Sequence, residues 1–277
     1  MMSKFIKRHN IIPQLLILIT IIFSIFPLYL MVVISLKTDQ EILKSPFSLP
    51  HVLQWANYIN AAIKMKIATV FFNSVVITGG AMVGLVFFGS MAAYPIARIP
   101  SKINNLVFLL FISGIMMPFQ SAMIPLYKVL KFLNVLNTIQ GIILVNCATS
   151  MAFTIFLYVG FMKTISRELE EAALIDGCSR FMAYWRIIFP LLKTITATVV
   201  IFNTMMIWND FLKPLLFFSG LNKGTMTTAV YTFQTQYDAQ WGYLFATCTL
   251  SSLPLLILYL ALQKHFIKGI AAGAVKG

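Results

Sequence analysis

Long apolar stretches recur along the chain and are separated by shorter polar segments. They cover residues 11–36, 67–97, 103–127, 132–162, 194–218 and 241–263. About 20 consecutive apolar residues cross the hydrocarbon core of a bilayer as an α-helix. The pattern therefore predicts an all-α membrane protein with six transmembrane helices, of which the fourth begins near Thr138. The fifth stretch differs from the others because it contains Asp210 and Lys213.

The composition supports a membrane protein. Only 10% of the residues are charged and 59% are hydrophobic. Soluble domains carry about 25% charged residues, and disordered chains are poor in apolar residues. The composition therefore excludes both classes. The three cysteines, Cys147, Cys178 and Cys248, are too widely spaced for a disulfide framework or a zinc cluster.

The first stretch follows a basic start formed by Lys4, Lys7 and Arg8, as the apolar part of a cleaved signal peptide does. Its apolar run is longer than that of a signal peptide, and no small-residue cleavage site follows it. We expect this stretch to remain as a transmembrane helix.

The net charge of +13 would suggest nucleic acid as the partner of a soluble protein. In membrane proteins, basic residues instead concentrate in the cytoplasmic segments. Six spans with the N-terminus inside place 13 of the 21 basic residues on the inner side. We therefore expect a multi-pass protein of the cell membrane, with both termini cytoplasmic, lipid around it and no nucleic-acid partner.

Polar and small residues occur inside the predicted spans. Asn203 and Asp210 are seven residues apart and share one helix face. They either line a polar translocation path or make interhelical hydrogen bonds at a solvated helix end, and the second interpretation is favoured for Asn146. Gly80 and Gly84 allow close helix packing, and Pro118 predicts a simple kink.

No catalytic or metal-binding constellation stands out. His9, His51 and His265 lie far apart in terminal or loop segments, and the phosphate-binding pattern GxxxxGK[ST] does not occur. A membrane enzyme such as a lipid-modifying transferase would need clustered His, Asp or Arg. A proton-coupled carrier usually has several intramembrane carboxylates, whereas this chain offers Asp210 alone. We expect a protein that is not an enzyme, with no catalytic residue, no metal site and no cofactor of its own.

The inner loop, residues 163–193, contains four of the eight acidic residues. Residues 168–176 predict a helix with acids in its first turn, which Gly177 ends. A second amphipathic stretch, residues 181–188, leads to Pro190 at the start of the fifth span. The apolar side chains of this helix–turn–helix need either a partner surface or the membrane interface.

The same loop carries a recognisable motif. Its residues in order are Glu171, Ala172, Ala173, Gly177, Ile187, Phe189 and Pro190. Their spacing matches the EAA motif, with Phe189 where Leu is usual. The chain thus resembles the membrane subunits of binding-protein-dependent ABC importers. Segments 117–118, 124–127, 136–138, 208–211 and 269–277 are similar to the carbohydrate-importing branch, and the tail is similar to that of the maltose-type permease.

This resemblance implies a type I ABC importer (MetI-like) transmembrane domain at residues 67–264. It is preceded by a peripheral helix and an outer segment at 1–66 and followed by a cytoplasmic tail at 265–277. The implied function is inward transport of a sugar or oligosaccharide. The implied partners are a sister permease, a cytoplasmic ATPase dimer that binds ATP and Mg, and an extracellular or periplasmic sugar-binding protein.

The resemblance also assigns roles to residues. Coupling to the ATPase is assigned to Glu171, Ala172, Ala173, Asp176, Gly177 and Pro190. A tail contact with the ATPases is assigned to Gly273, Lys276 and Gly277. The substrate pathway is assigned to Asn203, Trp208, Asn209 and Asp210. Alternatively, residues 208–211 form an outer gate or pack structurally.

Two other transport functions stay open at this point. One is a self-sufficient secondary carrier. The other is an ABC permease for a solute such as a polyol or a glycerol phosphate.

Overall fold

The computed structural model describes residues 11–220, 223–233 and 240–274, and within these ranges every regular element is a helix. The chain forms two compact units. The first contains residues 1–65 and 230–252, and the second contains residues 66–229 and 253–277. Each unit is described by itself.

Four of the described helices are long and apolar enough to cross a membrane by themselves. These candidate spans are Pro13–Ser35 in α1, Ile67–Arg98 (α4), Ile139–Met162 (α7) and Trp241–Leu260 in α14. Two further candidates are bent pairs of helices, so the number rises to six if each pair counts as one span. The predicted all-α membrane fold is confirmed, and α7 begins directly after Thr138.

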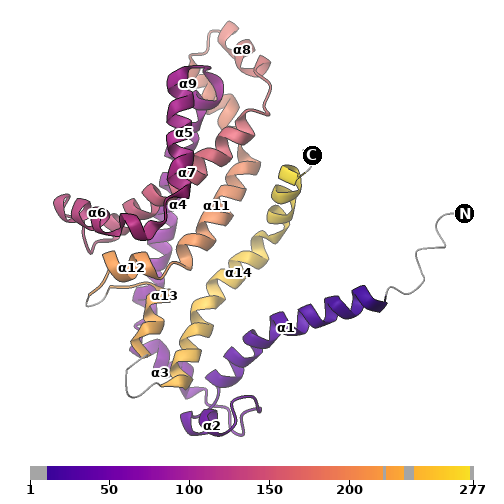
Figure 1. Ribbon diagram of the computed structural model, residues 1–277, viewed down its shortest axis with the longest axis vertical. Coiled ribbons are helices and arrows are strands. Elements are labelled where there is room, and N and C mark those ends of the chain that lie inside the picture. The colour runs from indigo at the N-terminus through magenta and orange to yellow at the C-terminus, as the bar shows by residue number, and fades with distance from the viewer. Residues whose placement is uncertain (1–10, 221–222, 234–239, 275–277) are drawn as a thin grey trace, which may run out of the picture. The chain divides into compact units, whose positions relative to one another are not determined.

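The second unit is built around α4 and α7, with α11 (Lys193–Trp208) packed beside both (Figure 1). Its core consists of apolar side chains from these helices, including Ile77, Leu85, Ile142, Val145 and Val199. Because lipid is as apolar as these side chains, tight packing rather than the hydrophobic effect holds such helices together.

Three glycines of α4 bring it close to α7. A Cβ atom added to Gly80 would lie 2.6 Å from the Ile143 side chain, and one added to Gly84 would lie 2.8 Å from the Cys147 sulfur. One added to Gly89 would lie 2.6 Å from the Thr154 methyl carbon. The predicted close packing at Gly80 and Gly84 is confirmed and extends to Gly89.

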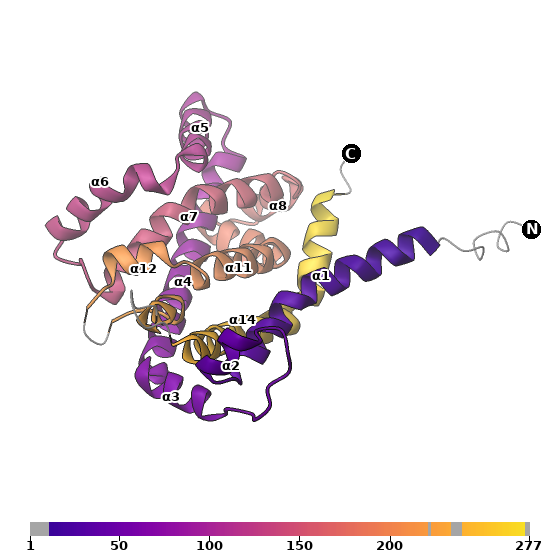
Figure 2. The ribbon, with the colours of Figure 1, turned by 60° about the horizontal axis from the view of Figure 1, so that its bottom comes forward.

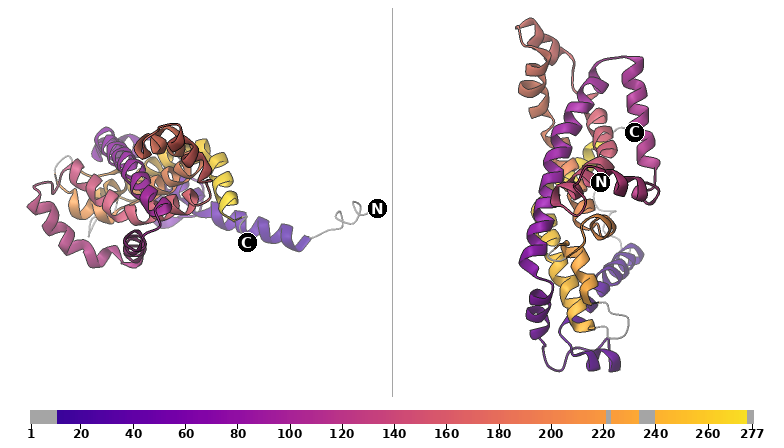
Figure 3. Two further views of the ribbon diagram at one scale, coloured as in Figure 1. Left: turned by 90° about the horizontal axis from the view of Figure 1, so that it is seen from above. Right: turned by 90° about the vertical axis from the view of Figure 1, so that its left-hand side faces the viewer.

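The third predicted span is not one helix, and the expected simple kink was wrong. α5 (Lys102–Met116) and α6 (Phe119–Phe132) meet at a bend of 107° (Figure 3). Met117 is extended, at φ −78 and ψ 120, because a residue that precedes proline is displaced from the helical region. At about 1.5 Å per residue α5 is about 22 Å long, too short to cross about 30 Å of hydrocarbon.

The fifth predicted span is also interrupted, so its predicted end at residue 218 was wrong. α11 ends at Trp208, and the short helix α12 (Leu212–Phe217) follows. Before α11 come α9 (Arg180–Ala183), the π-helical turn η1 (Tyr184–Ile188) and α10 (Phe189–Leu191), which contains Pro190. The segment Arg180–Leu191 meets α11 at 71°.

The first unit holds its polar segments by hydrogen bonds. It contains α1 (Ile11–Ser35), α2 (Asp39–Lys44), α3 (Ala56–Lys64), the 3₁₀ turn η2 (Val230–Phe233) and the start of α14 (Trp241–Ala274). Figure 2 shows α2 and α3 near this start of α14. The Gly242 amide donates to Asp39 Oδ1 at 3.1 Å, and the Asn60 side-chain amide donates to the Tyr243 hydroxyl at 3.3 Å.

Lys37 ends the first apolar stretch and is fully buried. Its ammonium group donates to the Ser45 carbonyl at 2.7 Å, the Pro46 carbonyl at 3.3 Å and Ser48 Oγ at 3.2 Å. Three neutral acceptors therefore satisfy its three donors. This arrangement fixes the segment that follows the helix.

The packing of α4 on α7 predicts different effects at two glycines of one helix. Gly89→Leu should lower the thermal unfolding temperature of the detergent-solubilised protein by several degrees, because overpacking a core typically costs about 1–3 kcal/mol. Gly79→Leu is the control, since nothing lies within 4 Å of an added Cβ there. Equal unfolding temperatures for the two variants, measured by size-exclusion chromatography after heating, would contradict the packing argument.

Candidate functional site: the loop between α7 and α11

The loop after α7 folds as the predicted helix–turn–helix. α8 (Glu168–Ile175) has three acidic residues in its first turn, where they complement the helix dipole. Gly177 ends it at φ +85, a conformation that favours glycine. The Cys178 amide then donates to the Ala173 carbonyl at 2.9 Å, and the Gly177 amide donates to the Leu174 carbonyl at 3.1 Å. These two bonds form a Schellman motif.

The two faces of α8 differ in exposure. Glu170 and Ala173 are buried against the rest of the chain. Glu171, Ala172 and Asp176 are exposed, and Ile175 is 85% exposed. An acidic surface with small and apolar side chains is therefore free to meet another molecule, while Ala173 packs inward.

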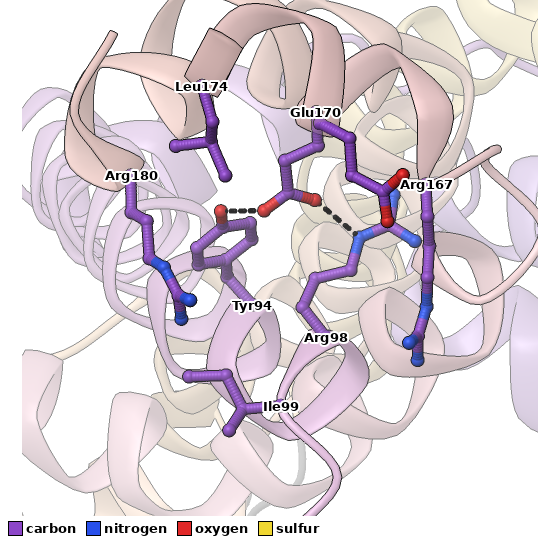
Figure 4. Close-up of a pocket in the computed structure, with 8 residues that line it drawn as sticks. Tyr94, Arg98, Ile99, Arg167, Glu170, Leu174 and Arg180 are labelled. Atoms are coloured by element: carbon purple, nitrogen blue, oxygen red, sulfur yellow. Dashed lines mark hydrogen bonds and ion pairs between the residues drawn. The ribbon is translucent and has the colours of Figure 1, made fainter. Parts of the chain in front are cut away.

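The buried Glu170 attaches α8 to the end of α4 (Figure 4). Its Oε2 lies 3.0 Å from Arg98 Nε, and its Oε1 accepts a hydrogen bond from the Tyr94 hydroxyl. Arg98 Nη1 also donates to the Ile165 carbonyl at 3.0 Å, in the connection between α7 and α8. One guanidinium group thus holds both the helix and the segment that leads into it.

A cavity lies beside this ion pair and has a charged rim. Arg167, Arg180 and Glu171 line it together with Tyr94, Arg98 and Glu170. Both rim arginines are exposed, and neither takes part in the ion pairs found in the described part of the chain. Their side chains stand on opposite sides of the glutamate in Figure 4.

The second half of the loop rests on the same helix. The Tyr184 hydroxyl donates to Ser90 Oγ at 2.7 Å, and the Tyr184 ring lies 5.0 Å from the Tyr94 ring. The Trp185 ring lies 5.5 Å from the Phe87 ring. Trp185 is thereby half-buried within the chain, whereas Phe181 stays 65% exposed. Figure 1 shows α8 and α9 together at the end of the unit where α4 ends.

The residues assigned to a substrate pathway differ in exposure, and three of them are bound within the chain. Asn203 is buried, and its side-chain amide donates to Thr154 Oγ1 at 3.3 Å and to the Val199 carbonyl at 2.9 Å. Trp208 is also buried and contacts the Phe71 ring edge-on at 6.1 Å. These contacts favour interhelical bonding for Asn203 and packing for Trp208.

Asp210 forms an ion pair with Lys213 at 2.7 Å and also accepts from the Lys213 backbone amide at 3.1 Å. Lys213 Nζ donates in addition to Asn146 Oδ1 at 3.2 Å. The carboxylate is therefore neutralised within the chain and fixes the start of α12. Asn209 beside it is exposed.

Sequence reasoning missed the residues that anchor the loop: Ser90, Tyr94, Arg98 and Glu170. The sequence contained part of the evidence, because Ser90, Tyr94 and Arg98 are polar residues at every fourth position in an otherwise apolar helix end.

Of the assigned tail residues, Gly273 lies in α14, and Lys276 and Gly277 lie outside the described residues.

Comparison with known proteins identifies the family. Residues 85–272 match the model of the binding-protein-dependent transport system inner membrane component. The chain is 35% identical to the probable starch degradation products transport system permease protein AmyC of Thermoanaerobacterium thermosulfurigenes, over 98% of this chain and 99% of that protein. It is 38% identical to the melibiose/raffinose/stachyose import permease protein MelC of Bacillus subtilis (strain 168), over 91% of each chain.

A solved structure agrees in fold. It is a bacterial ABC transporter involved in the import of the acidic polysaccharide alginate, with a TM-score of 0.82 at 19% identity, covering 93% of this chain and 96% of that one. Together with the membrane-spanning helices and the loop just described, the family match shows that this chain is a transport subunit rather than an enzyme. The chain belongs to the family of binding-protein-dependent transport system inner membrane components.

Proposed function

We propose that this chain is one of two different permease subunits of an ATP-driven importer that moves a sugar or oligosaccharide into the cell. The observation that carries the proposal is the exposed acidic face of α8 in a chain of this family. One named relative is the permease of a probable transport system for starch degradation products, and the other is a permease for the import of melibiose, raffinose and stachyose. A cytoplasmic ATPase dimer supplies the ATP and Mg site, and an extracellular or periplasmic binding protein delivers the sugar.

The loop is proposed to dock on the ATPase through Glu171, Ala172 and Asp176. Glu171 is exposed and without an ion-pair partner among the described residues, so it can pair with a basic group of the ATPase. Gly177 gives the turn its shape, and Ala173 keeps α8 close to the chain. Pro190 lies in α10, directly before the bend into α11, and this bend relays movement of the loop into the membrane.

This docking sets the orientation. The loop, both termini and the tail at 265–277 face the cytoplasm, and the domain at 67–264 forms one half of the pathway. Residues 1–66 precede it as a peripheral helix and an outer segment. The tail contact through Gly273, Lys276 and Gly277 is part of the same proposal.

The substrate pathway is proposed near the C-terminal end of α11. Asn209 is the exposed polar residue there and is free to hydrogen-bond a sugar hydroxyl. Asn203, Trp208 and Asp210 shape the wall through the contacts described above. A secondary carrier is less well supported, because Asp210, the acidic residue of the fifth predicted span, lies after the end of α11 and is already paired with Lys213.

Co-purification tests the proposed function. In mild detergent the wild-type chain should bring down a sister permease and an ATPase. Glu171→Lys should keep the sister permease but reduce the recovered ATPase about thirtyfold or more, because a lost interfacial charge pair costs about 2–5 kcal/mol. Lys128→Glu, a charge reversal at an exposed position of α6 outside the loop, is the control. Recovery of the wild-type chain without any ATPase would reject the proposal.

The turn at Gly177 gives a second prediction. Gly177→Val should abolish most sugar uptake, because a β-branched residue resists a φ of +85. Gly177→Asn should retain it, since asparagine tolerates the left-handed conformation. Uptake of radiolabelled sugar by cells with equal membrane amounts of each variant measures the difference. Equal uptake by the two variants would show that the turn conformation is not needed.

The proposed contact of the tail gives a third prediction. Deletion of residues 272–277 should lower the sugar-stimulated ATP hydrolysis of the reconstituted importer, since the tail is proposed to contact the ATPases. Exchanging the same six residues for a Gly-Ser segment shows whether hydrolysis depends on the length of the tail or on its side chains. Hydrolysis at the wild-type rate after the deletion would count against the contact.

A further inference from the structure

Three polar side chains form a row along the last turns of α4. Ser90, Tyr94 and Arg98 are four residues apart, so they project from one face of the helix. Each contacts the loop between α7 and α11. Ser90 accepts from Tyr184, whereas Tyr94 and Arg98 both hold Glu170. We call these three residues the α4 polar row.

The row matters because α8 has little else to hold it. A helix of 8 residues is marginal without tertiary contacts. Only Glu170 and Ala173 of α8 are buried, while Leu169 is 48% and Ile175 85% exposed. Besides the packing of α8 on α9 and η1, the bonds of one carboxylate therefore contribute directly to the position of α8 relative to α4.

Those bonds are well shielded from water. The side chains of Arg98 and Glu170 are only 6% and 12% exposed. An ion pair in such surroundings is screened little by salt and water, so the carboxylate keeps a defined position. Arg98 also holds the Ile165 carbonyl, so the helix and its connection to α7 are fixed by the same group.

The contacts reach further into the membrane through α4. Tyr184 attaches the second half of the loop to Ser90. Gly80, Gly84 and Gly89 lie further along the helix and pack it closely on α7. A displacement of the loop therefore has a direct mechanical route to the α4–α7 pair, besides the route through Pro190 into α11.

We propose that Glu170, held by Arg98 and Tyr94, is a positioning residue that transmits movement of the loop directly into α4. The inference rests on the proposed function, in which the loop contacts the ATPase. Two neighbouring glutamates then have different tasks. Glu171, exposed at the rim of the cavity, is the one proposed to pair with the ATPase, whereas the buried Glu170 bonds to the chain's own membrane helix.

The test uses the complete importer reconstituted in vesicles, with sugar uptake and ATP hydrolysis measured on the same preparation. Glu170→Gln should retain the ATPase on co-purification but lower the sugar imported per ATP hydrolysed about tenfold, because the neutral amide loses the ion pair with Arg98. Tyr94→Phe should lower the same ratio by a smaller factor. Tyr94→Phe removes one hydroxyl and leaves the ring beside Tyr184. It therefore tests the proposal even if Glu170→Gln does not fold.

Lys128→Gln is the control, because Lys128 is an exposed charged residue of α6 outside the loop, and its ratio should equal that of the wild type. A loss of stability would lower the yield of importer without changing the ratio. A wild-type ratio in both Glu170→Gln and Tyr94→Phe, with ATPase bound, would overturn this inference and leave the proposed function intact. Loss of the ATPase from Glu170→Gln would also overturn it, since Glu170 would then act in docking. A wild-type chain that binds no ATPase would overturn both.

Discussion

The close packing of α4 on α7 is the constraint on which the second unit depends. Within lipid no hydrophobic gain drives helices together, so the contact relies on backbones that approach closely. Gly80, Gly84 and Gly89 provide this along about three turns of α4. The remaining parts of the unit attach to the pair: α11 packs beside both helices, and the α4 polar row receives the loop.

Two kinds of interaction thus stabilise different parts of this unit. Apolar side chains and glycines hold the membrane helices, whereas charged and hydroxyl groups hold the loop outside them. The difference follows from the surroundings. A buried ion pair stabilises a structure only when both charged groups are held in good geometry. Helices in lipid associate through complementary shape and close packing. The two tasks therefore rest on different residues. The packed helices provide stability, whereas the polar bonds fix the position of one small helix and so transmit its movement.

The sequence predicted those elements that depend only on residues near one another in the chain. Continuous apolarity located α4 and α7, and Gly177 marked the turn after α8. Apolarity did not reveal the bend between α5 and α6, because residues 103–127 contain no charged residue on either side of Pro118. The end of α11 was missed for a similar reason, since Asp210 and Lys213 neutralise each other only once the chain has folded. Nor does composition distinguish Glu170 from Glu171, because burial of one of two adjacent acids depends on Arg98, far away in the sequence.

The buried Lys37 has a consequence for how the first helix sits in lipid. α1 has 25 residues and is about 37 Å long, which exceeds a hydrocarbon thickness of about 30 Å. A helix with a mobile flanking lysine could absorb this mismatch at either end by letting the charge follow the interface. Here the ammonium group is already bound to the Ser45 and Pro46 carbonyls, so that end cannot adjust. The excess length must instead be accommodated by tilting of the helix, by a kink at Pro27, by local thickening of the bilayer, or at the opposite end, near Ile11.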